Sequence, residues 1–253
     1  YFIINGNEKI IICQESICDN KIFVFKNIRQ NKYLSAEIKS VNIDGVNISI
    51  LNTVKYFYKN KTIHIETSIF KSSLNIFLYL KLLGLNTDKE LIENIVYDID
   101  KNKYLLQELN PSRIEFEKII KENNINNKDD LETYLLNFYI IRNYNKDIKF
   151  THEDKLKKMY ASIESHILPH LYNDSKKKAF YFGIMINKLI NIYLGNVPYD
   201  DRDDYSNKII NTPQYLLKNL TRQLIYKSIK NMNKCLKKDL NNNKSKKKCH
   251  NEL

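Results

Sequence analysis

Glycine is scarce in this sequence, with 5 residues among 253, and tryptophan is absent. Loops that wrap nucleotide phosphates with their backbone need several glycines at fixed spacing, as in the G-x-x-x-x-G-K-[ST] and G-x-G-x-x-G motifs. Neither motif occurs in the chain, and a serine or cysteine nucleophile elbow is also missing. The sequence therefore excludes the common P-loop, dinucleotide-binding and hydrolase sites.

Cysteine is rare as well, and the 4 cysteines form no C-x-x-C pair. We therefore expect reduced thiols in an intracellular protein rather than a disulfide framework. A zinc site on Cys13 and Cys18 is the weaker alternative, because neither their spacing nor a nearby pair of histidines supports it. His166 and His170 have the spacing of two ligands on one helical face, but Pro169 lies between them. A helix that ends before His170 is the preferred interpretation.

Long apolar runs are missing too. No stretch approaches the ~20 apolar residues that a membrane-spanning helix needs. The apolar residues 180–194 are interrupted by Asn187, Lys188 and Asn191. We therefore expect no membrane as a partner. Tyr1 is not an initiator methionine, and the opening residues resemble the middle of a strand, so we expect a piece of a longer protein.

Positive charge is what the chain has in excess, with a formal net charge of +12. From Lys218 to the end there are 11 basic and 2 acidic residues. Apolar and basic residues alternate there at helical spacing: Leu217, Leu220, Leu224, Met232, Leu236 and Leu240 against Lys218, Arg222, Lys227, Lys230, Lys234 and Lys238. We predict a helix that starts at Thr212-Pro213, docks through its apolar stripe and presents cations to phosphate backbones. An ordinary solvated helix is the alternative, and residues 241–253 are predicted to fray.

Strands are predicted in the first third of the chain and helices after it. β-branched and aromatic residues indicate strands over residues 2–4, 10–14, 21–26, 33–41, 46–51, 54–58 and 62–68, with hairpin turns at Asn5-Gly6 and Asp44-Gly45. Helices are predicted from near Ser72 to Gly84, from a capping box at Thr87, from Thr151 toward Pro169, and across 180–194 as a buried central helix. This order, without βαβ alternation, favours an α+β fold: antiparallel strands, then a helical subdomain, then the basic helix.

Charges are densest at residues 200–204, Asp-Asp-Arg-Asp-Asp. Such a cluster is costly to bury unless its members pair, and the planar guanidinium of Arg202 can bridge two carboxylates. We predict a structural charge knot of Asp201, Arg202 and Asp203. Two alternatives stay open. One is an acidic loop that caps a helix. The other is a Mg²⁺ site formed by Asp98, Asp100 and the acidic cluster, disfavoured because Arg202 would compete for the same oxygens.

Short matches to one protein family run through the chain in the order that the family has them. They are Tyr1-Phe2-Ile3-Ile4-Asn5-Gly6-Asn7-Glu8-Lys9 with Gln14-Glu15, Ala36-Glu37-Ile38-Lys39-Ser40, Leu83-Gly84 with Asp88-Lys89-Glu90, Tyr97-Asp98, Leu168-Pro169-His170, Lys178-Ala179-Phe180 and Asp200-Asp201-Arg202-Asp203. Together these residues resemble the second-largest, beta-like subunit of multisubunit DNA-dependent RNA polymerases. The resemblance is to the lobe of that subunit, flanked by two pieces of its protrusion, and helices joined by a loop are expected within residues 110–149.

The resemblance implies a domain organisation and a role. Residues 1–16 would be the end of the first protrusion piece, 17–197 the lobe, and 198–253 the returning protrusion piece with its basic tail. In this family, lobe and protrusion line one wall of the cleft that holds template DNA and the RNA–DNA hybrid. The catalytic Mg²⁺ is held by the largest subunit, so we expect no catalytic residue, metal or cofactor in this segment.

The expected partners are template DNA, the RNA–DNA hybrid and other polymerase subunits, chiefly the largest. The expected location is intracellular: the nucleus or, for a viral protein, the virion or a cytoplasmic factory. By the same resemblance, the charge knot matches the family's DDRD motif and helps to fix the returning segment. Lys208 occupies a basic position after that motif and is the expected phosphate contact, together with Lys218 and Arg222 on the basic helix.

Three positions depart from the family pattern near Lys208. The family usually has a basic residue where Ile209 stands, an acidic one at Asn211 and often glycine at Gln214. The form of residues 207–213 is closer to polymerases of large DNA viruses. A function from a different class remains as the alternative: a stand-alone basic nucleic-acid-binding or transcription accessory module that reuses the lobe fold.

Overall fold

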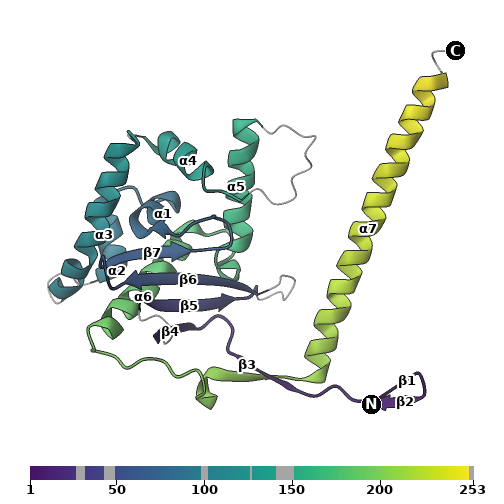
Figure 1. Cartoon of the computed structure of the whole chain (residues 1–253), viewed down its shortest axis with the longest axis horizontal. Helices are drawn as coiled ribbons and strands as arrows, with labels where there is room; N and C mark the ends of the chain where they lie inside the picture. The colour runs from purple at the N-terminus through teal and green to yellow at the C-terminus, as the bar shows by residue number, and fades with distance from the viewer. Residues whose placement is uncertain (27–31, 43–48, 98–101, 126, 141–150, 251–253) are drawn as a thin grey trace. The chain divides into compact units, whose positions relative to one another are not determined.

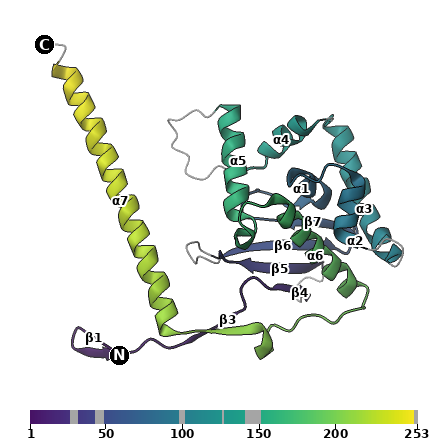
Figure 2. The ribbon, with the colours of Figure 1, turned by 180° about the vertical axis from the view of Figure 1, so that it is seen from behind.

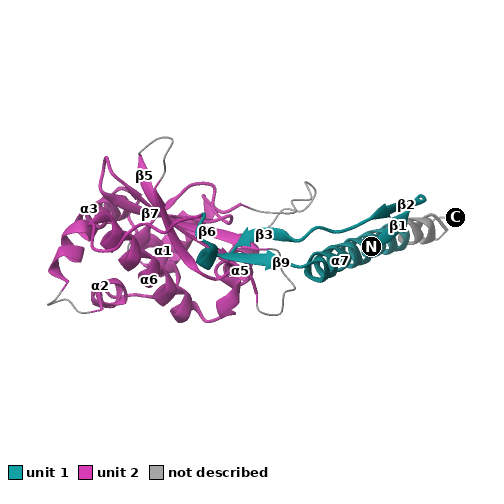
Figure 3. Cartoon of the chain, turned by 90° about the horizontal axis from the view of Figure 1, so that it is seen from below, with its two compact units in different colours: residues 1–17, 203–253 teal, residues 18–202 magenta. Residues whose placement is uncertain are grey.

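The computed structural model describes residues 1–26, 32–42, 49–97, 102–125, 127–140 and 151–250, the last ten of these for the backbone alone. Most of the strands precede the helices and all strand pairs are antiparallel, which confirms the predicted α+β fold (Figure 1). The chain divides into two compact units (Figure 3). We call residues 18–202 the body, and residues 1–17 with 203–253 the end unit. The assignment of residues 1–16, 17–197 and 198–253 to protrusion and lobe stays a prediction.

The body is built on a five-stranded antiparallel sheet in which neighbours in sequence are neighbours in space. Its strands are β4 (Ile22–Lys26), β5 (Tyr33–Ser40), β6 (Ile50–Phe57), β7 (Thr62–Glu66) and β8 (Leu74–Asn75). The predicted strands 46–51 and 54–58 form one strand within the described residues, because Asn52 and Thr53 continue the ladder against Ile38 and Glu37. The predicted turn at Asp44-Gly45 lies outside the described residues.

Helices cover the sheet and complete the body. They are α1 (Ile76–Leu82), α2 (Asp88–Val96), α3 (Lys103–Glu122), α4 (Lys128–Leu136), α5 (His152–His166), the 3₁₀ turn η1 (Pro169–Leu171) and α6 (Ser175–Tyr193). The predicted starts at Thr87 and Thr151 are confirmed, since both hydroxyls accept an N–H of the first turn within a capping box. Gly84 follows α1 at φ +102°, as expected of a residue that ends a helix.

The core of the body centres on α6, which packs across β4, β5 and β6 and against α2 (Figure 2). Phe182, Met185, Ile186 and Leu189 of α6 are fully buried, which confirms the predicted central helix. Gly183 is required where α6 meets α2, because a Cβ at this position would lie 2.2 Å from the backbone carbonyl oxygen of Asn94. The close approach of the two helices therefore depends on a residue without a side chain.

The end unit consists of two short ribbons and one long helix. Strands β1 (Phe2–Ile4) and β2 (Asn7–Lys9) form the predicted hairpin, with Asn5 and Gly6 both at positive φ. The predicted strand over residues 10–14 is wrong. The chain instead forms β3 (Gln14–Ile17), which pairs with β9 (Lys208–Asn211) near the other end of the sequence. Residues 10–13, Ile-Ile-Ile-Cys, have no partner strand among the described residues, and apolar, β-branched side chains alone do not make a strand without one.

Helix α7 (Pro213–His250) starts where Thr212-Pro213 predicts it and runs 38 residues. Residues 241–250 are helical, where the sequence predicted fraying, because the Asn- and Lys-rich run contains no proline or glycine to end the helix. Within the described part of the end unit, Asn207 is the one residue in the buried class. The end unit has no apolar core of its own among these residues. No described helix combines the length and apolar character needed to cross a membrane.

Candidate nucleic-acid interface

Lys208 opens strand β9, directly after the 3₁₀ turn η2 (Tyr205–Asn207). Its ammonium group forms an ion pair with the Glu15 carboxylate of β3, lies 3.9 Å from a carboxylate oxygen of Asp203, and sits 5.6 Å from the centre of the Tyr205 ring. The hydrogen bond with Glu15 raises the pKa of Lys208 above its ordinary value. Lys208 is therefore cationic at neutral pH, and it already has anionic partners.

Lys218 and Arg222 lie four residues apart on α7, so they share one face of the helix. Lys218 is exposed and Arg222 is half-buried. Farther along the helix, Lys227, Lys230, Lys234 and Lys238 are exposed as well. These four lysines follow one another at steps of three and four residues, so they lie along one side of α7, where exposed ammonium groups suit a phosphate backbone.

No described part of the end unit covers the apolar stripe of α7, and its predicted docking stays a prediction. Leu220, Leu224, Met232, Leu236 and Leu240 keep 52–61% of their surface accessible. The reason lies in the make-up of the end unit, because two-stranded ribbons offer too little apolar surface to cover a helix of this length.

Asp200 and Arg202, two residues of the acidic motif, find partners in the body. The Asp200 carboxylate accepts the Val24 N–H at 2.7 Å and the Lys188 ammonium at 2.7 Å. The Asp200 N–H in turn donates to the Val24 carbonyl at 3.3 Å. Residue 200 therefore binds β4 along the edge of the sheet, on the side where β4 has no strand beside it within the described part of the chain.

Arg202 continues this edge contact. Its guanidinium stacks 3.8 Å from the centre of the Phe25 ring and pairs with the Glu37 carboxylate at 3.4 Å. Asp203 belongs to the end unit and lies near Lys208. Glu37 of strand β5 is thus a partner of Arg202 that the sequence did not predict, and the charge knot of Asp201, Arg202 and Asp203 stays a prediction. The motif attaches the chain to the edge of the sheet, and the predicted role of fixing the returning segment remains a prediction.

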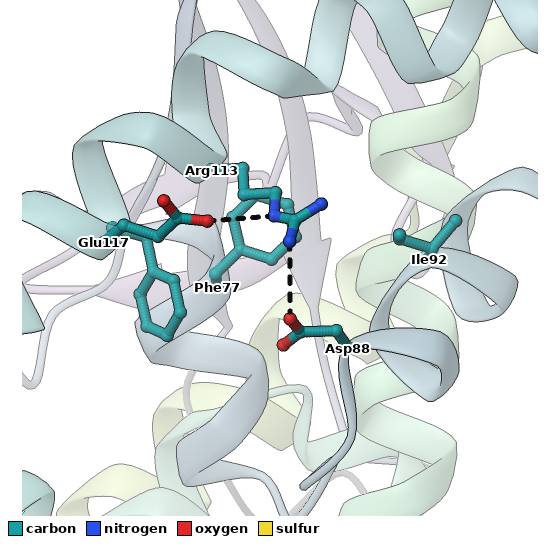
Figure 4. Close-up of a pocket in the computed structure, with 6 residues that line it drawn as sticks. Phe77, Asp88, Ile92, Arg113 and Glu117 are labelled. Carbon is teal, nitrogen blue, oxygen red and sulfur yellow. Dashed lines mark hydrogen bonds and ion pairs between the residues drawn. The ribbon is translucent and has the colours of Figure 1, made fainter. Parts of the chain in front are cut away.

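A small hollow in the body lies between α1, α2 and α3 (Figure 4). Arg113 points across it between the Glu117 carboxylate, at 3.2 Å, and the Asp88 carboxylate, at 3.7 Å. Phe77 is among the apolar residues that line it. None of the predicted site residues lines this hollow, so it supports no part of the predicted interface.

His170, the second residue of the histidine pair, contributes to the packing of the body. Helix α5 ends at His166, as predicted. The His170 ring lies beyond that end, with its Nδ1 at 2.7 Å from the Ser40 hydroxyl and its edge against Tyr181. Burial and the nearby Lys178 ammonium lower the pKa of His170. Among the described residues, no three histidine, cysteine or acidic side chains are grouped so that they could bind a metal ion.

Lys178 is almost fully buried, which is unusual for a lysine. Its ammonium donates to the backbone carbonyls of Ile163, at 3.2 Å, and Glu164, at 2.8 Å. These carbonyls belong to the last turn of α5, where the helix dipole favours a cation. Burial lowers the pKa of Lys178 to about 8. The residue therefore joins the end of α5 to the start of α6.

Comparison with known proteins completes this description. The family model described as RNA polymerase Rpb2, domain 2, matches residues 18–211. The chain belongs to this family. The match takes in the entire body and continues through β9, so Asp200, Arg202 and Lys208 all lie inside the Rpb2 domain 2 segment.

Individual relatives extend the similarity beyond domain 2. DNA-directed RNA polymerase II subunit 2 of Arabidopsis thaliana is 28% identical over 96% of this chain and 20% of its own length. DNA-directed RNA polymerase subunit Rpo2 of the archaeon Saccharolobus solfataricus is 28% identical over 94% of the chain and 20% of its own length. DNA-directed RNA polymerase II subunit RPB2 of Eremothecium gossypii is 30% identical over 90% of the chain and 18% of its own length. The chain thus spans about a fifth of the length of these relatives.

Sequence reasoning missed the partners of the predicted site residues. Glu15 pairs with Lys208, Glu37 with Arg202, and Lys188 with Asp200. Glu15 and Glu37 belong to short matches that signalled the family, but nothing in their local sequence indicates a partner more than 160 residues away. Lys188 carried a usable signal, because a lysine within an apolar helix needs a partner for its ammonium group.

Proposed function

We propose that this chain is a segment of the second-largest subunit of a DNA-directed RNA polymerase and forms part of the wall of the DNA-binding cleft. The family match over residues 18–211 carries this proposal. It is supported by polymerase subunits from a plant, a fungus and an archaeon that align with 90–96% of the chain. In this proposal the body corresponds to the lobe and the end unit to pieces of the protrusion.

The activity of the complete enzyme would be template-directed transfer of nucleotides to RNA. This segment would contribute binding and positioning, while the largest subunit carries the catalytic Mg²⁺. Its partners would be template DNA, the RNA–DNA hybrid and the other polymerase subunits, chiefly the largest. The enzyme would act in the nucleus of a cellular source, or in the virion or cytoplasmic factory of a large DNA virus, which the pattern of residues 207–213 favours.

The positive face of α7 would hold nucleic acid through its phosphates. Exposed Lys218 and half-buried Arg222 support this assignment, as does the excess of 11 basic over 2 acidic residues from Lys218 onward. Contacts of this kind neutralise phosphates and release counterions, so affinity depends steeply on salt and weakly on base sequence. Lys208 would add a further contact at the start of β9.

A fluorescence anisotropy titration of the whole chain tests the proposed interface. The double variant Lys218→Ala/Arg222→Ala is expected to weaken binding to two unrelated DNA duplexes equally. It should also lower the slope of log affinity against log salt concentration by about 2, close to 0.9 for each lost phosphate contact. Lys89→Ala/Lys128→Ala is the matched control, since it removes two exposed lysines of the body that pair with Glu93 and Glu132. Equal slopes for the two variants would contradict the assignment to α7.

The alternative of a stand-alone basic module is not favoured by the comparisons, because the relatives that match are polymerase subunits along nearly the whole chain. Sequencing the parent transcript through both ends of the segment separates the two functions. A reading frame that continues for many hundreds of residues is expected for the polymerase subunit. A start codon just before Tyr1 together with a stop codon after Leu253 would reject it.

A further inference from the structure

In the ion pairs of Lys208, the lysine side chain is much less exposed than the carboxylate side chains. This difference affects how Lys208 would bind a phosphate. The Lys208 side chain is 18% exposed, whereas the side chains of its partners Glu15 and Asp203 are 50% and 94% exposed. The carboxylates that pair with its ammonium group therefore stand in solvent. A phosphate that binds Lys208 has to displace them or share the ammonium group with them.

The position of Glu15 follows from the register of the β3–β9 ribbon. Ile17 is the residue opposite Lys208, and Glu15 is two residues away on the same strand. Residues two apart on a strand share one face of the ribbon, so the Glu15 and Lys208 side chains meet diagonally across it. Asp203 approaches the same ammonium group from the segment before η2. Two separate parts of the end unit thus supply one cation with carboxylate oxygens.

Exposed ion pairs of this kind contribute little to stability, since water and salt screen them. A carboxylate that leaves Lys208 returns to solvent at small cost. A phosphate that replaces it offers the same oxygen chemistry with more charge. The Tyr205 ring, 5.6 Å from the ammonium group, would remain beside Lys208 during the exchange and keep its cation–π contact.

We propose that Glu15 and Asp203 are intramolecular stand-ins for nucleic-acid phosphate: they occupy Lys208 while the site is empty and are displaced when a phosphate binds. This inference rests on the proposed function, in which Lys208 contacts the phosphate backbone. It adds that the contact forms by exchange of one anion for another. The carboxylates therefore lower the affinity of the site for nucleic acid, because they compete with phosphate for Lys208.

A competing explanation is that the Glu15–Lys208 pair only staples β3 to β9. The two explanations differ in the effect of removing a carboxylate. If the pair only holds the two strands together, removal of a carboxylate should disrupt the structure and should not increase the affinity for nucleic acid. If a phosphate replaces the carboxylate, its removal should increase that affinity, provided that Lys208 is present. Asp203 separates them further, because it lies outside both strands of the ribbon.

The experiment measures anisotropy of a labelled DNA duplex and of an RNA–DNA hybrid with the whole chain. Variants are Glu15→Gln, Asp203→Asn and Lys208→Gln, alone and combined. Glu8→Gln is the matched control, since it removes the same charge from an exposed position on β2. Glu15→Gln and Asp203→Asn are each expected to tighten binding more than the control does, by up to about fivefold, the equivalent of one exposed ion pair. This excess should vanish in the Lys208→Gln background.

Each outcome separates the inference from the function on which it rests. If Lys208→Gln leaves affinity unchanged, the proposed contact at Lys208 is wrong, and the inference falls with it. If Lys208→Gln weakens binding but neither acidic variant exceeds Glu8→Gln, the contact stands and the exchange is overturned. Equal gains with and without Lys208 would mean a general effect of net charge, which also overturns it. Should Glu15→Gln lose its circular dichroism spectrum, Asp203→Asn decides the question.

Discussion

Replacing Asp200 should release the chain from the edge of the sheet. In Asp200→Ala, the Lys188 ammonium loses its carboxylate and the Val24 N–H loses its acceptor. Hydrogen bonds to charged groups contribute about 1.5–3 kcal/mol each. The Asp200 and Lys188 side chains are 21% and 29% exposed, so water replaces part of what is lost. We expect the free energy of unfolding to fall by about 2–3 kcal/mol.

Two variants separate the charge from the hydrogen bond. Asp200→Asn keeps the shape of the side chain and an acceptor oxygen for Val24, so it should cost less than Asp200→Ala. Lys188→Met removes the cation. In a double-mutant cycle with Asp200→Ala, the two effects should be less than additive, because each single change already breaks the same pair.

Urea denaturation followed by near-ultraviolet circular dichroism of the tyrosines measures the loss of stability, since the chain has 18 tyrosines and no tryptophan. Hydrogen exchange of the peptide that contains Val24 measures the release of the edge locally. A loss below about 0.5 kcal/mol, the range of ordinary surface substitutions, together with unchanged exchange at Val24, would refute the role given to Asp200.

The remaining predictions concern the packing of the body. Gly183→Ala should lower the urea midpoint by the equivalent of about 1–3 kcal/mol or more, because its Cβ would meet the Asn94 carbonyl oxygen at 2.2 Å; an unchanged midpoint would show that α2 and α6 separate freely. The pKa of Lys178, lowered to about 8 from 10.5, means that the unfolded chain binds more protons between these values, so stability should rise with pH from about 8 to 10.5. Lys178→Met should remove that part of the rise, and identical pH profiles would contradict it. Arg202→Ala should slightly destabilise the chain through the lost stacking on Phe25, and Arg202→Lys should restore little of it, as judged by thermal unfolding.

Local signals in the sequence predicted the ends of several elements correctly. Thr87 and Thr151 each begin a helix because the hydroxyl and the acidic residue three positions later satisfy one another's N–H groups within a single turn. Asn5-Gly6 makes a hairpin because both residues accept positive φ. Such signals need no knowledge of the rest of the fold. They failed at residues 10–14, where a strand needs a partner that the local sequence does not contain.

The sequence was sufficient to name the cationic residues of the candidate site. It was not sufficient to predict which side chains lie beside them. Lys208, Lys218 and Arg222 were named from their charge and from the family resemblance, and their contacts with phosphate remain predictions. That Lys208 is occupied by Glu15 follows from the pairing of β3 with β9, which brings together residues 193 positions apart. Ion pairs form wherever the backbone places opposite charges, and no pattern in either segment specifies that placement.

Sequence alone determined the fold class, the central helix α6, the start of α7 and the family, because composition, periodicity, capping residues and short motifs act over a few residues. Tertiary structure decided which carboxylates pair with Lys188, Arg202 and Lys208. It also decided that the close approach of α2 and α6 requires glycine at position 183. Periodicity predicted that the apolar stripe of α7 docks, and the described part of the end unit leaves it uncovered. Periodicity reveals that a helix has an apolar face. Only the arrangement of the other elements decides whether anything covers it.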